Sequence, residues 1–102
     1  MLAELTLQDF EPVIGSLFEC RLPDGGDQVI ACQLREATPL GESGMGAGSR
    51  RPFSLLFFAA GRSDLVQQIF SLTHPRLPAP LEVFLVPVGS ADGGLLLEGI
   101  FN

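Results

Sequence analysis

His74 is the only histidine of this 102-residue chain and the residue best suited to acid–base chemistry. A general base acts only with a nucleophile or a carboxylate within hydrogen-bond reach. Its nearest candidates along the chain, Thr73 and Glu82, do not stand at a spacing that defines a catalytic motif. We therefore expect His74, which precedes Pro75, to be a surface or turn-stabilising residue, and we expect the protein not to be an enzyme.

Two cysteines, Cys20 and Cys32, are the other residues that could do chemistry. They are too few for a disulfide scaffold. Together with one histidine they could hold zinc only if carboxylates completed the site, and none is suitably spaced. We expect two packed core thiols, with no metal and no cofactor.

The stretch TPLGESGMGAGSRRP predicts a flexible Gly/Ser-rich loop at about residues 40–51. Gly44, Gly46 and Gly48 resemble a phosphate cradle, but no Lys-Ser/Thr pair or helix follows them. The segment GESGM also fails as a nucleophile elbow, because Met45 stands in the place of the last glycine. The loop carries no recognisable catalytic motif.

Composition predicts one folded domain over residues 1–102. Hydrophobic residues make up 46% of the chain, and its net charge is −6 because 12 acidic side chains face only 6 basic ones. This balance argues against nucleic acid and against anionic membranes, both of which attract basic patches. The N-terminus has no basic, apolar leader and no stretch is long enough to span a membrane, so we expect a cytoplasmic protein.

The N-terminal segment predicts a helix of one or two turns over Thr6–Glu11. Thr6 is a suitable N-cap, Asp9 completes a variant of the capping box, and Leu5 could pack against Phe10. Pro12 then ends the helix. We expect this helix to close one end of the fold.

The next two segments, SLFECRL and QVIACQLRE, predict a β-hairpin around PDGGD. The apolar residues share one face if Phe18 pairs with Leu34 and Cys20 with Cys32. That register requires a loop of three or five residues. It also predicts that both cysteines point inward.

The remaining segments FSLLFFA, LVQQIFSLT, LEVFLVPVG and LLLEGIFN predict further strands, with Phe70 and Leu72 inward. Pro87 indicates an edge position or a bulge, and Gly99 a bulge or a close backbone approach. The fold class is therefore mainly β: a small antiparallel β-barrel or sandwich of about six strands with one short N-terminal helix.

Two of these strands, FSLLFFA and LEVFLVPVG, are apolar on both faces, whereas a strand with one solvated face alternates. The surplus apolar face could lie at the centre of a sandwich or in a contact with another chain. The candidate interface residues are Phe53, Leu56, Phe58, Phe84, Val86 and Val88.

The leading function is a non-enzymatic structural or adaptor protein that binds a protein partner or itself. The alternative is a small-molecule-binding β-barrel or an enzyme that uses the loop at Gly41–Arg51 together with His74. A deep pocket with convergent polar groups would favour the alternative.

The segments LTLQDFEPVIGSLF, RPFSLLF and LTHPRLPAPLEVFLVPVG, with the terminal FN, resemble a bacterial family known as domain of unknown function 6916. The resemblance spans almost the whole chain, and no catalytic residue is defined for the family. It implies a small cytoplasmic bacterial protein. It also implies proximity to phage-tail-like collar proteins, and hence a role in building or loading a tail or fibre.

Overall fold

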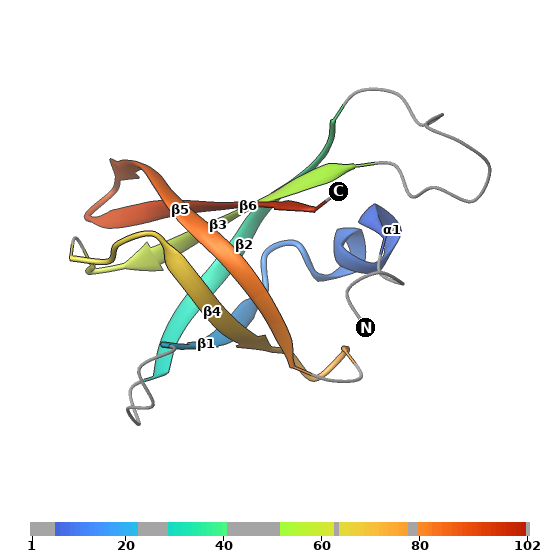
Figure 1. Cartoon of the computed structure of the whole chain (residues 1–102), viewed down its shortest axis with the longest axis horizontal. Coiled ribbons are helices and arrows are strands. Elements are labelled where there is room, and N and C mark those ends of the chain that lie inside the picture. Colours follow the sequence, from blue (N-terminus) through green and yellow to red (C-terminus); the bar gives the residue numbers. More distant parts are fainter. Residues whose placement is uncertain (1–5, 23–28, 41–51, 63, 78–79, 102) are drawn as a thin grey trace.

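The computed structural model of the chain describes residues 6–22, 29–40, 52–62, 64–77 and 80–101. Within these ranges, a helix α1 (Leu7–Phe10) and a 3-10 turn η2 (Glu11–Val13) precede six strands. The strands are β1 (Leu17–Arg21), β2 (Val29–Pro39), β3 (Phe53–Ala60), β4 (Gln68–Thr73), β5 (Leu81–Ala91) and β6 (Gly94–Phe101). They form one closed antiparallel barrel in the order β1-β2-β3-β6-β5-β4 (Figure 1). The predicted fold class is confirmed, and the barrel is the correct alternative.

Strand β5 lies between β4 and β6 in the barrel and pairs with them along different parts of its length. Its first half pairs with β4, as in Ile69 with Phe84, and its second half pairs with β6, as in Val86 with Glu98. The register shifts between Pro87 and Gly89. Of the two alternatives predicted for Pro87, an edge position or a bulge, the structure has the bulge, which bends the strand and raises its twist. Pairing of β4 with β1 then closes the barrel.

The β1–β2 hairpin has the predicted faces but not the predicted register. Phe18 pairs with Cys32 and Cys20 pairs with Ile30, so the predicted pairs Phe18–Leu34 and Cys20–Cys32 are wrong by two residues. A shift of two residues keeps every side chain on its face, which is why the inward set was still predicted correctly. The predicted loop of three or five residues falls on residues 23–28, outside the described residues.

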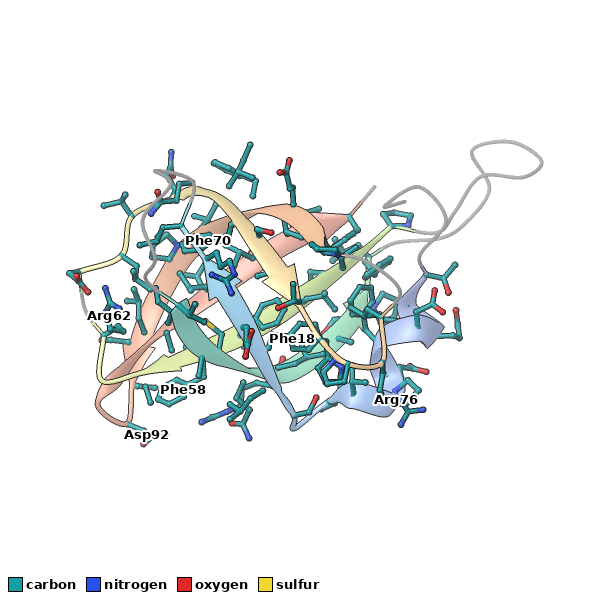
Figure 2. The ribbon with its side chains drawn as sticks, turned by 90° about the horizontal axis from the view of Figure 1, so that it is seen from below. Phe18, Phe58, Arg62, Phe70, Arg76 and Asp92 are labelled. Carbon is teal, nitrogen blue, oxygen red and sulfur yellow. The ribbon has the colours of Figure 1, made fainter. Side chains whose placement is uncertain are left out.

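Side chains of all six strands fill the barrel. The fully buried set includes Phe18, Cys20, Leu34, Leu55, Phe57, Phe70, Leu72, Leu85 and Leu97. Figure 2 shows Phe18 and Phe70 between the strands, whereas Phe58 lies at the periphery. Small barrels are packed with side chains in this way rather than hollow.

Helix α1 closes one end of the barrel (Figure 1). The backbone N–H of Thr6 donates to the Asp9 carboxylate at 2.7 Å. This is the bond from the N-cap backbone to the N3 side chain that the predicted capping box requires. Phe10 is fully buried, and its ring centroid lies 5.7 Å from that of Phe53 and 5.6 Å from that of Phe101. The predicted staple residue Leu5 lies outside the described residues.

Residues 41–51, which contain most of the predicted Gly/Ser-rich loop, also lie outside the described residues. The backbone N–H of Leu40 donates to the carbonyl of Pro52 at 2.9 Å. This bond joins the two chain segments that flank the loop.

Candidate functional site

His74 lies in the connection between β4 and β5 and contacts the segment before β1. Its Nδ1 accepts a hydrogen bond from the backbone N–H of Arg76 at 3.0 Å, and its Nε2 lies 2.8 Å from Ser16 Oγ. The imidazole ring centroid lies 4.5 Å from that of Phe18. These contacts match the predicted role of His74 in stabilising a turn.

The Ser16–His74 pair has the distance of a nucleophile and its base but the opposite hydrogen-bond direction. Because Nδ1 accepts from Arg76, the neutral ring carries its proton on Nε2, which then donates to Ser16 Oγ. The Ser16 hydroxyl in turn donates to the carbonyl of Val13. A catalytic base needs a free lone pair aimed at the hydroxyl. The pair therefore ties the end of η2 to the β4–β5 connection and does not activate Ser16.

Replacing His74 by alanine is expected to leave the barrel folded and to lower its free energy of unfolding by about 1–2 kcal/mol at neutral pH, because two hydrogen bonds are lost. Burial, followed by the charge of Arg76, lowers the pKa of His74 below its ordinary value. The unfolded chain therefore takes up the proton first, and the contribution of His74 is complete only above about pH 6.5. Urea unfolding of both proteins should show their difference shrinking as the pH falls further. A difference that is constant with pH would contradict this role.

An open cavity of about 550 Å³ lies beside this pair. It is lined by Leu17, Phe18, Glu19, Ala31, Thr73, His74 and Pro75. Leu17 is 61% exposed, and both ring nitrogens of His74 are already engaged with the protein. A ligand site combines enclosure with convergent polar groups, so this groove gives little support to a small-molecule site.

Cys20 and Cys32 are free thiols on the inner face of the hairpin, and both are buried. A side-chain hydrogen bond with Cys32, followed by burial, raises the pKa of Cys20 far above its ordinary value. Cys20 is therefore an uncharged thiol at neutral pH. A buried thiol in this state packs as a small hydrophobic side chain.

The described part of the chain lacks the features of a metal site and of a membrane-crossing helix. There, no three His, Cys, Asp or Glu side chains gather in a group that could hold a metal ion. No helix in the same ranges is long and apolar enough to cross a membrane.

The structure separates the six candidate interface residues by exposure. Phe84 and Val88 are both 51% exposed, and Leu56 and Val86 are half-buried. Phe53 lies in the core at 0% and Phe58 is 8% exposed. Neither Phe53 nor Phe58 therefore offers much area to a partner.

Phe58 points out of the barrel but is covered by its own chain. The Arg35 guanidinium carbon lies 4.3 Å from the centre of the Phe58 ring. On β6, a Cβ at Gly94 would lie only 2.5 Å from Phe58 Cζ, so the ring occupies the space that a side chain would fill. An aromatic ring over a neighbouring glycine is a known way to cover outward apolar area. The outward apolar face of β3 is thus partly covered by other strands of the same chain.

The outward face of β4, β5 and β6 carries an apolar row made of Ile69, Phe84 and Ile100. Ile69 pairs with Phe84. The Phe84 carbonyl oxygen lies 3.5 Å from where a Cβ of Gly99 would be, which places β5 beside β6 there. Phe84 and Ile100 each lie two residues beyond the last β5–β6 pair, Val86 with Glu98, and so on the same outward face as that pair. The three side chains are 50%, 51% and 49% exposed. Sequence reasoning found Phe84 but missed Ile69 and Ile100, because only the register aligns them.

Acidic residues flank the apolar row. Glu82 lies two residues before Phe84 on β5, and Glu98 lies two residues before Ile100 on β6. Because β5 and β6 are antiparallel, these two carboxylates stand on opposite sides of the row.

Fold and surface together define a small, filled, closed six-stranded barrel with a helical plug and a half-exposed apolar row on one outer face. The family model described as domain of unknown function (DUF6916) matches residues 5–101. The chain belongs to this family. No curated protein and no solved structure matches the chain significantly.

Proposed function

We propose that this protein is a non-enzymatic structural or adaptor module that binds another protein chain through the apolar row. The observation that carries this proposal is the exposure of Ile69, Phe84 and Ile100, each about half accessible on adjacent strands. Single exposed apolar residues are ordinary, whereas adjacent ones often mark a contact surface.

The energy available on this face suits a protein contact. Covering the remaining half of each of the three side chains contributes about 1 kcal/mol apiece. Val88 and the half-buried Leu56 and Val86 add to this area. Such a sum supports specific association only when polar neighbours of the partner also match.

A link to phage-tail-like assemblies, in a bacterial cytoplasm, is the part of the proposal that comes from the family resemblance. In that setting the module joins components of a tail or fibre. A filled barrel that presents a rigid outer face suits such a joining role, because little ordering entropy is lost on binding.

Phe84→Glu is expected to abolish partner binding while leaving the barrel folded, because the new carboxylate is placed in the contact but remains solvated in the free protein. The measurement is a pull-down of tagged protein from its native cells, analysed by mass spectrometry, with circular dichroism as the folding check. The matched control is Leu17→Glu, which charges an apolar residue on β1 that is 61% exposed, against 51% for Phe84. Proteins retained by the wild type and by Leu17→Glu should be lost from Phe84→Glu. Retention by all three, or a wild type that binds nothing and stays monomeric at high concentration by light scattering, would reject the proposal.

A further inference from the structure

The charges on the apolar face are all of one sign. Strands β4, β5 and β6 contain two ionisable side chains, Glu82 and Glu98, and no lysine, arginine or histidine. Glu82 is exposed and Glu98 is half-buried. One carboxylate therefore stands on either side of the apolar row: Glu82 at its edge, and Glu98 between Leu56 and Val86, with which it pairs on β3 and β5.

The arginines of the described residues are placed elsewhere. Arg35 lies over Phe58, Arg62 pairs with Asp64 at 2.9 Å, and Arg76 follows His74 in the β4–β5 connection. Arg21 pairs across β1–β4 with Ser71, two strands away from Glu82. None of these four lies on β4, β5 or β6.

This charge pattern disfavours a second copy of the chain as the partner that covers the apolar row. Two such faces in contact would bring together rims to which β4, β5 and β6 contribute only carboxylates as charged groups, on chains of net charge −6 each. Like charges brought together cost several kcal/mol, and a desolvated carboxylate without a partner adds to that cost. The same rim matches a partner whose basic side chains flank an apolar centre.

We propose that the apolar row docks a different protein, through a segment with an apolar centre and Lys or Arg on both sides that pair with Glu82 and Glu98. This inference rests on the proposed function and specifies the chemistry of the partner. Apolar contact at Phe84 holds the segment, and the two carboxylates set its orientation and speed its association.

The test is site-specific photo-crosslinking in the native cells, with Phe84→p-benzoylphenylalanine in the full chain. The cross-linked peptide is identified by mass spectrometry, and the partner is then purified for binding measurements. We expect apolar residues at the cross-link with lysine or arginine on both sides of it. Glu82→Gln combined with Glu98→Gln should weaken binding at least about 10-fold, and raising the salt should weaken the wild type similarly. Glu11→Gln, an exposed acidic residue on η2, is the matched control and should leave affinity unchanged.

Several results would overturn this inference and separate it from the proposed function. A cross-link to a second copy, or to a segment without flanking basic residues, rejects the basic partner but leaves the proposed protein-binding role in place. Binding that is unaffected by the double Glu→Gln change likewise rejects only the basic partner. The absence of any cross-linked protein rejects both proposals.

Discussion

Phe10→Ala is expected to lower the free energy of unfolding by about 3–5 kcal/mol, the largest loss among the changes considered for this chain. Phe10 is fully buried and is the residue through which α1 contacts the stacked rings of Phe53 and Phe101, whose centroids are 4.8 Å apart. Its removal leaves a cavity at the end of the barrel that the flanking strands cannot close. Urea unfolding followed by circular dichroism measures the loss.

Phe84→Ala is the matched control for this prediction. It removes the same side chain from a position that is 51% exposed, so its expected cost is about 1 kcal/mol or less. Equal losses for the two variants would mean that α1 is not a structural plug. The same comparison checks that Phe84 can be changed for binding studies without unfolding the barrel.

Gly94→Ala is expected to cost about 2–3 kcal/mol, because the site is filled by the neighbouring strand. A Cβ there would lie 2.6 Å from the carbonyl oxygen of Ala59 as well as close to the Phe58 ring. A ring can rotate away, but a backbone carbonyl in a sheet moves only with its strand. Thermal and urea unfolding should both show the loss.

Gly89→Ala provides the control on the adjacent strand. A Cβ at Gly89 meets nothing within 4 Å, so the stability should change by no more than about 0.5 kcal/mol. If Gly94→Ala proved as mild as Gly89→Ala, the close contact of β3 with β6 at Phe58 would be disproved. The register that aligns the apolar row depends on that same pairing of strands.

The candidate site was only partly predictable from the sequence. Phe84 was found because β5 is apolar at both odd and even positions. Its neighbours Ile69 and Ile100 were not, since they lie on other strands and become adjacent only through the register. Ser16 was likewise missed as the partner of His74, because 58 residues separate them.

The interface prediction for Phe58 shows why apolar pattern alone cannot separate a covered face from an exposed one. Phe58 does point outward, on the second apolar face of β3. Its ring nevertheless lies between the Arg35 guanidinium of β2 and the backbone of Gly94 on β6, which together cover it. Cover of this kind depends on neighbours across the sheet, and a single strand carries no information about them.

The sequence by itself determined the strands, their inward faces, an edge position or a bulge at Pro87, and the helix that ends before Pro12. These features follow from period-two alternation, proline geometry and helix capping, all of which act within a few residues. Only the tertiary structure decided the closure of the barrel, the hairpin register and the alignment of Ile69, Phe84 and Ile100. Each of these depends on pairing between distant segments, where a shift of two residues preserves every local pattern and changes every neighbour.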